Sequence, residues 1–321
     1  MEALERLCKL ASTPGDEGEV FDLMASRWRA SGWQVKPIGA YAQTARLPPK
    51  WRGRGPKVLI TAHADSPGYA IDCLNPPHAI ALGAPTMGNT NRKKATIEAV
   101  INGSTKVRLS SDGDDGRAVL IKGLGKNSVI RLGDRVSWAG QFDYSPKTNL
   151  IHATFLDNRV GCWLTLKLAE TFRKSPPKTF EPILAVTSSE EMTGFGARAV
   201  AQKIQPDFVI ALDTTYEAKR QGVHLGGGPV LTLSDASVLI SRRLRDHICA
   251  VFAVHDLPLQ TEVYNFSGTD AKAFPPALIL PLLIPTKGNH SPNETADWRD
   301  ILTLKTALET LIPELFGFAP A

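Results

Sequence analysis

Five apolar segments of this sequence end in side chains that can bind metal ions or move protons. Three of them are KVLITAHAD (57–65), PILAVTSSEE (182–191) and DFVIALD (207–213). The other two are HATFLD (152–157) and ALILPLLIPTKGNH (277–290). Together the five segment ends supply seven candidate site residues: His63, Asp65, Asp157, Glu190, Glu191, Asp213 and His290.

Two imidazoles with several carboxylates, and no cysteine, form a ligand set that suits borderline divalent cations. One zinc ion takes about four ligands, so this set supplies three ligands to each of two ions if one carboxylate bridges them. Two-metal hydrolytic sites hold their ions about 3.5–4 Å apart, which is a span that a carboxylate can bridge. We therefore predict two divalent metal ions, with zinc as the simplest choice and cobalt or manganese as alternatives.

Glu190 and Glu191 are adjacent at the point where a buried strand should end. A strand directs neighbouring side chains to opposite faces, so the two carboxylates cannot be equivalent. We expect one to bind a metal ion and the other to act as a general base toward a water that the metals acidify. His63 and Asp65 fit a further pattern, in which a carboxylate orients a ligating imidazole.

The elements that must position these residues alternate between strands and helices. Strand and helix patterns alternate in residues 1–69 and again from about residue 151, which predicts an α/β fold. We expect a mostly parallel mixed sheet flanked by helices on both faces. Because ligands collect at the carboxyl ends of strands in such sheets, the five segment ends would meet at one edge.

Residues 70–150 have a different character. Turn signals such as NPP, NGS, KGLG and LGD separate short β-prone stretches, which are TIEAVI, KVRL, AVLI and SVIRL. This pattern is typical of a small all-β unit. We therefore predict a catalytic α/β domain formed by 1–69 plus 151–321, with a β-barrel-like domain inserted at 70–150.

The composition excludes several classes of partner. The net charge of +5 is small, and the densest basic run, SRRLR (241–245), reads as a solvated helix face, so we expect no nucleic acid. No apolar run approaches the ~18 residues of a membrane span, and the N-terminus reads as an amphipathic helix. The four cysteines are far apart and form no CxxC pair, so we expect reduced thiols and a cytoplasmic protein.

Six motifs in order along the chain resemble one known family. They are HAD (63–65), LDNRVG (156–161), SEEMTGFGA (189–197), ALD (211–213), GTDA (268–271) and HSPNE (290–294). They resemble the dinuclear-metal aminopeptidases of the glutamyl and deblocking type, which form tetrahedral assemblies and include members labelled endoglucanase-like. In that family a β domain follows the His-x-Asp strand, where residues 70–150 lie in this chain.

The resemblance implies an exopeptidase-like fold and a role for each site residue. Asp157 would bridge the two metals, and the peptide bond after it would be cis. His63 and Asp213 would complete one metal site, whereas Glu191 and His290 would complete the other. Glu190 would be the general base, and Asp65 would orient His63.

The resemblance also implies partners. These are short peptides as substrates and a homo-oligomer, from a dimer up to a dodecamer, in which the insert serves as a subunit contact or lid. Asp270 in GTDA is placed near the site. Lys287 stands where the family often has arginine. It is either a surface lysine or a residue that meets a substrate carbonyl or a neighbouring subunit.

Other functions remain open at the level of the residues. An N-acyl-amino-acid deacetylase or a carboxypeptidase uses a similar dinuclear site. A glycosidase also uses paired acids, but these need no metal and stand ~5–10 Å apart. A catalytically inactive scaffold is disfavoured because every position of the predicted ligand set carries a competent side chain.

Overall fold

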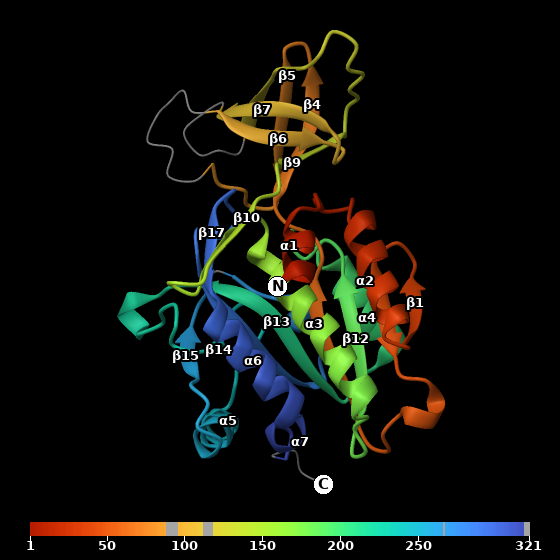
Figure 1. Cartoon of the computed structure of the whole chain (residues 1–321), viewed down its shortest axis with the longest axis vertical. Helices are drawn as coiled ribbons and strands as arrows, with labels where there is room; N and C mark the ends of the chain where they lie inside the picture. Colours follow the sequence, from red (N-terminus) through yellow and green to blue (C-terminus); the bar gives the residue numbers. More distant parts are fainter. Residues whose placement is uncertain (88–95, 112–117, 266, 318–321) are drawn as a thin grey trace.

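The chain forms a large α/β body from which a small β-barrel projects (Figure 1). The structure is a computed structural model that describes residues 1–87, 96–111, 118–265 and 267–317. Among these residues, no helix combines the length and the apolar character that a membrane crossing requires.

The body is built on one eleven-stranded mixed sheet. Its path runs in the order β1 (Gln34–Ile38), β2 (Ala42–Arg46), β12 (Glu181–Thr187), β3 (Lys57–His63), β13 (Phe208–Tyr216), β16 (Leu278–Lys287), β17 (Glu294–Asp297), β11 (Leu150–Ala153) and β10 (Phe142–Ser145). β14 (Val230–Ser234) pairs with β16 and with β15 (Gln260–Val263).

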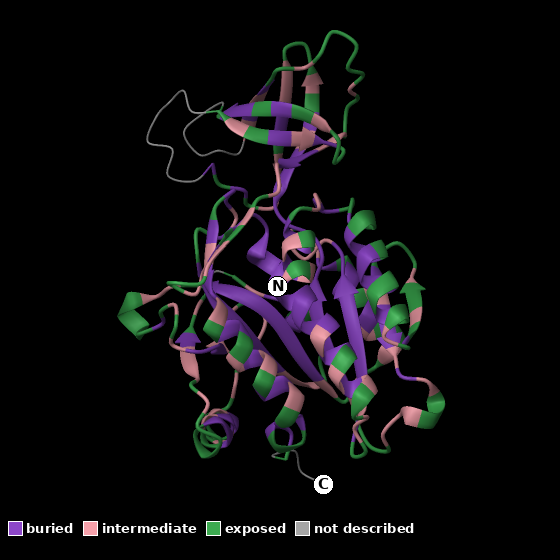
Figure 2. Cartoon of the chain, viewed as in Figure 1, coloured by how far each residue is buried: buried purple, intermediate pink, exposed green. Residues whose placement is uncertain are grey.

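The four central strands β12, β3, β13 and β16 are parallel, whereas β2 and β17, which flank them, pair antiparallel with them. The central strands are apolar and buried along most of their length (Figure 2). Such continuous apolar runs are expected where helices cover both faces of a parallel sheet. The predicted α/β class is therefore confirmed, with the parallel pairing concentrated at the centre of the sheet.

Helices pack on the two faces of this sheet. They are α1 (Glu2–Cys8), α2 (Gly18–Ala30), α3 (Leu156–Lys174), α4 (Phe195–Ile204), α5 (Arg242–Val254), α6 (Trp298–Thr310) and α7 (Ile312–Leu315). The described residues also include the short 3-10 turns η1 (Pro49–Trp51), η2 (Lys219–Gln221) and η3 (Asp270–Ala273). Along β3, Val58 and Ile60 pack into the core that contains α3, whereas Leu59 faces the core that contains α4. The alternation of a strand thus fills both layers.

The inserted part is a closed six-stranded barrel with its own core. Its strands are β4 (Gly68–Leu74), β5 (Pro77–Leu82), β8 (Ala118–Lys122), β7 (Thr105–Ser111), β6 (Ile97–Ile101) and β9 (Arg135–Trp138), in that spatial order. Alternate residues such as Tyr69 and Ile71 point into the barrel, where they meet Leu109 and Val119. Closure leaves no open sheet edge in the barrel.

The prediction of one strand in the insert is wrong. The stretch SVIRL (128–132) is not a strand, and Val129 and Leu132 are 82% and 64% exposed. Only Ile130 of this stretch packs against the barrel core. β9 already closes the barrel between β4 and β6, so this apolar stretch has no strand to pair with there.

Candidate metal centre

The seven predicted residues lie together at the carboxyl edge of the parallel strands. His63 is the last residue of β3, and Asp213 lies near the end of β13. Glu190 and Glu191 follow β12, and His290 follows β16. These strands are neighbours and run in the same direction, so their carboxyl ends meet at one place, as in other open α/β sheets.

Asp157 reaches this edge by a route that the sequence did not predict. The strand before it, β11, is antiparallel to β17 and lies in the flank of the sheet. Asp157 instead lies in a kinked turn at the start of α3, where its own backbone is not helical and its peptide bond to Asn158 is cis, as the family resemblance implied. The Asn158 side chain donates to Leu212 O at 2.7 Å, which ties this turn to β13 next to Asp213.

The ligand-type atoms form two groups that share Asp157. His63 Nε2 lies 3.2 Å from Asp157 Oδ1 and 3.2 Å from Asp213 Oδ1. His290 Nε2 lies 3.4 Å from Asp157 Oδ2 and 3.4 Å from Glu191 Oε2. In each trio the ligand atoms all lie within 4.8 Å of one another, so each trio is compact enough to surround one ion. The two oxygens of Asp157 face different trios.

Burial and the neighbouring charges shift the pKa values of the carboxyl groups in this cluster. Burial raises the pKa of Glu191 to about 8, although the His290 imidazole acts in the opposite direction. Burial also raises the pKa of Glu190 well above its usual range. For Asp157, the effect of burial is outweighed by the His290 and His63 imidazoles, which hold its pKa well below the usual range. The cluster therefore needs positive charge close to its carboxylates.

The residues present fit divalent cations. Within the described residues, Glu191 Oε1 is buried and makes no hydrogen bond, and Asp157 Oδ1 has only the His63 imidazole 3.2 Å away. An unpaired buried carboxylate oxygen is costly unless a cation or a donor meets it. Two trios of nitrogen and oxygen donors around one shared carboxylate supply the ligand types and the number of contacts that such ions take.

Two buried carboxylates hold the backbone of the candidate ligands. Asp65 accepts hydrogen bonds from Glu190 N and Glu191 N, at 3.0 and 3.1 Å. Its carboxylate lies 3.6 Å from His63 Nδ1, and its own carbonyl oxygen lies 3.1 Å from that nitrogen. Asp65 thus contacts both the imidazole of one trio and the loop that carries the glutamate pair.

Glu294 is the second of these carboxylates, and sequence reasoning did not assign it a role. It accepts from Asp157 N and from His290 N, both at 2.9 Å, with a different oxygen for each. It therefore fixes the backbone of two candidate ligands that are 133 residues apart. Its position at the end of the HSPNE motif was the available signal.

Glu17 is a third buried acid beside the site, and no motif pointed to it. Its Oε1 accepts from Gly15 N at 2.8 Å and from Ser189 N at 3.1 Å. Ser189 has a positive φ of 57°, a left-handed conformation that non-glycine residues adopt rarely. Glu17 and Asp65 together hold the three successive amides of residues 189–191.

A cavity of about 390 Å³ opens over the two trios. Its walls include Glu190, Met192, Tyr216, Tyr264 and Lys272. The ammonium of Lys272 lies 3.9 Å from Glu190 Oε1. Glu190 belongs to neither compact trio, so its carboxylate faces the cavity without being enclosed by the candidate ligand atoms.

Two further predicted neighbours of the site lie at its margins. Asp270 is buried behind the site and accepts a hydrogen bond from Thr187, the last residue of β12. Lys287 lies in a neighbouring hollow of about 890 Å³ and pairs with Glu217 at 3.0 Å. Neither residue lines the 390 Å³ cavity.

An α/β fold with two such trios at the carboxyl edge of its sheet is the arrangement of a metal-dependent hydrolase. A model of the family described as M42 glutamyl aminopeptidase matches residues 125–306, which is more than half of the chain. The chain belongs to this family. It is a metal-dependent aminopeptidase, as the motifs of its sequence indicated.

Individual relatives agree with this assignment. FrvX of Escherichia coli (strain K12) is 27% identical, with 98% of this chain and 96% of FrvX covered. The lysyl aminopeptidase of Pyrococcus furiosus is 23% identical, with 83% of this chain and 84% of that protein covered.

Solved structures share the whole fold. A TET aminopeptidase from a marine sediment Thaumarchaeota archaeon is 17% identical and superposes with a TM-score of 0.88 over 99% of both chains. The TET1 peptidase of Pyrococcus horikoshii is 20% identical, with a TM-score of 0.81 over 97% of this chain and 98% of that chain.

The geometry of Glu294 yields a specific prediction. In Glu294→Gln, the side-chain oxygen can still accept from one amide, but the new NH2 group meets the other amide donor to donor. We expect the variant to retain its metal about 10- to 100-fold more weakly, as is usual when a group that orients a ligand is changed. Equilibrium dialysis followed by elemental analysis measures this.

Glu262→Gln is the matched control. Glu262 is also a buried carboxylate, but both of its partners are threonine hydroxyls, which can reverse donor and acceptor roles. We expect it to retain metal normally. Equal metal retention by Glu294→Gln and the native protein would contradict the role of Glu294.

Proposed function

We propose that the chain removes N-terminal residues from short peptides with two divalent metal ions, zinc by preference. The observation that carries the proposal is the sharing of Asp157 between two compact trios. In this proposal His63 and Asp213 complete one metal site, Glu191 and His290 complete the other, and Asp157 bridges them. When bound, the ions would polarise the scissile carbonyl and acidify a water molecule.

Glu190 is proposed as the general base. Its side chain lines the cavity beside the two trios without belonging to either. It would take a proton from the attacking water and return it to the amine that leaves. Asp65 supports this role because it holds Glu190 N, and Glu17 supports it by holding the preceding amide.

Short substrates suit the size of the cavity. At about 390 Å³ it lies at the lower end of the range, about 300–1,000 Å³, that is typical of small-molecule sites. The aromatic rings of Tyr216 and Tyr264 stack with centroids 6.5 Å apart and form one wall. We propose that this space takes the first residue or two of a peptide, with its free amine near the acidic edge.

We also propose that the chain forms a homo-oligomer through the inserted barrel, whose strands β4 to β9 run from Gly68 to Trp138. The Pyrococcus horikoshii TET1 peptidase is described as assembling into a tetrahedron or a large octahedral shell. In this chain the large apolar side chains of Val129 and Leu132 are exposed on the insert. The four free thiols suit the cytoplasm, which is the location that we propose.

Activity and metal content test the proposed function together. We expect the purified protein to hydrolyse aminoacyl anilides with a free amine, to leave N-acetylated analogues intact, and to lose activity after chelation. Asp157→Ala should bind less of both metals, since it removes the shared ligand, whereas Asp213→Ala should affect mainly one. Full activity in a preparation without divalent metal would contradict the proposed function.

The base assignment has its own test. Glu190→Gln preserves size but cannot take a proton, so we expect kcat to fall by about 10²–10⁴-fold with metal content unchanged. Glu191→Gln should instead release metal, because it alters a ligand. Steady-state kinetics and elemental analysis on the same samples separate the two effects. Near-normal turnover by Glu190→Gln would refute the assignment.

The oligomer is tested by charge on the insert. We expect Val129→Asp combined with Leu132→Asp to reduce the mass measured by light scattering after size exclusion. Leu239→Asp, at an exposed apolar residue of the α/β body, serves as the control. An unchanged mass in the double variant would exclude these residues from the subunit contact.

A further inference from the structure

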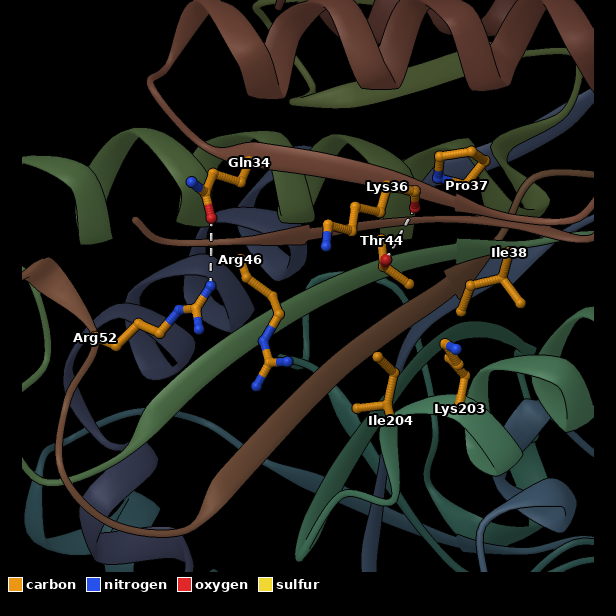
Figure 3. A pocket seen from close by; sticks show the side chains of 9 residues that line it. All are labelled: Gln34, Lys36, Pro37, Ile38, Thr44, Arg46, Arg52, Lys203 and Ile204. Atoms are coloured by element: carbon orange, nitrogen blue, oxygen red, sulfur yellow. Dashed lines mark hydrogen bonds between the residues drawn. The ribbon is translucent and has the colours of Figure 1, made fainter. Parts of the chain in front are cut away.

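A second, basic hollow of about 260 Å³ lies at the β1–β2 side of the sheet (Figure 3). Four cationic side chains line it: Lys36 from β1, Arg46 from β2, Arg52 from the residue after η1, and Lys203 from the last turn of α4. Its remaining lining residues are Gln34, Pro37, Ile38, Thr44 and Ile204.

This basic hollow is separate from the candidate metal centre. Arg46 pairs with Ile183 near the start of β12, whereas Ala42 pairs with Thr187 at the end that leads to the glutamate pair. Four residues of strand correspond to about 14 Å along the sheet. No residue of the two trios lines the hollow.

The two arginines are held in place but are not neutralised. Glu181 Oε1 lies 2.7 Å from Arg46 Nη2 and 3.4 Å from Arg52 Nε. Arg52 also donates to the side-chain oxygen of Gln34 at 3.3 Å. Four cations and one carboxylate leave a net formal charge of +3 around the hollow. Glu181 thus orients two guanidinium groups, but its single negative charge offsets only one of their two positive charges.

The two lysines are not needed for the nearby helix end. A cation at a helix C-terminus is favourable because the last carbonyls are unpaired. At α4, however, Lys57 Nζ already donates to Ile204 O at 3.1 Å and to Gln205 O at 2.9 Å. Within the described part of the chain, neither Lys36 nor Lys203 forms an ion pair. Their ammonium groups are therefore available to a ligand.

We propose that this hollow binds a small polyanion of the phosphate or carboxylate type. Guanidinium groups offer parallel donors that match the oxygens of both anions, and lysines add mobile point charges. The volume is below the range of about 300–1,000 Å³ that is typical of drug-sized ligands, which favours a compact anion. The aliphatic parts of Pro37, Ile38 and Ile204 form the rest of the wall.

Thermal unfolding of the metal-loaded protein tests this site. The probes are inorganic phosphate and succinate in separate arms, each compared with chloride at equal ionic strength. A ligand that binds only the folded state raises the melting temperature, and we expect a rise of about 2 °C or more with at least one probe. The arm that responds identifies the anion type.

Two double variants locate the effect. Lys36→Gln with Lys203→Gln should abolish most of the rise, since both side chains are exposed and neither change disturbs the core. Lys126→Gln with Lys219→Gln removes the same charge elsewhere and should keep it. An equal rise in all three proteins would place the anion outside this hollow and overturn the proposal, as would the lack of any response to both probes.

Discussion

The candidate site buries several carboxylates together at one edge of a sheet, and the rest of the site offsets the unfavourable free energy of that burial. Like charges that are removed from water repel one another and lose their hydration. On the side that faces the cavity, the imidazoles of His63 and His290 meet these carboxylates, and the donor set suits divalent cations. On the outer side, other carboxylates accept hydrogen bonds from backbone amides of the same loops. These imidazole and N–H partners offset part of the negative charge, and the buried Glu191 oxygen without a hydrogen bond marks where a cation would offset more.

Those outer hydrogen bonds also explain why the site combines elements from both parts of the sheet. The parallel centre delivers His63, Asp213 and the glutamate pair to one edge. The antiparallel flank contributes Glu294 at the start of β17, and this residue holds Asp157 and His290 in place. The flank is therefore part of the site, because it fixes the backbone from which two of the candidate ligands project.

Features that arise from short-range patterns could mostly be predicted from the sequence. Apolar strands that end in histidine or acids and are followed by helices predict the parallel centre of the sheet. They also predict that the candidate ligands lie at its carboxyl edge. The pattern failed where the outcome depended on a distant partner. SVIRL has the composition of a strand but pairs with none of the described strands. HATFLD leads out of the flank, so Asp157 reaches the site from the non-helical kink at the start of α3.

Residues whose importance lies only in a long-range contact could not be predicted at all. Glu17 stands in an unremarkable turn, and nothing in its neighbourhood indicates that it holds an amide 172 residues away. The same holds for the basic hollow, whose cations come from β1, β2, the residue after η1 and α4. Lys203 follows Arg46 by more than 150 residues, so no local run of basic residues marks the hollow.

The distribution of charge along β12 shows how these two features are connected. Glu181 at the start of this strand is shared by Arg46 and Arg52, whereas the loop at its other end carries the glutamate pair. Acid therefore exceeds base at the carboxyl edge, and base exceeds acid around the hollow near the opposite end. A modest net charge of +5 conceals this separation. The acidic end of β12 favours cations and the basic end favours anions. The strand between them is apolar, so the two regions of opposite charge remain separate within one sheet.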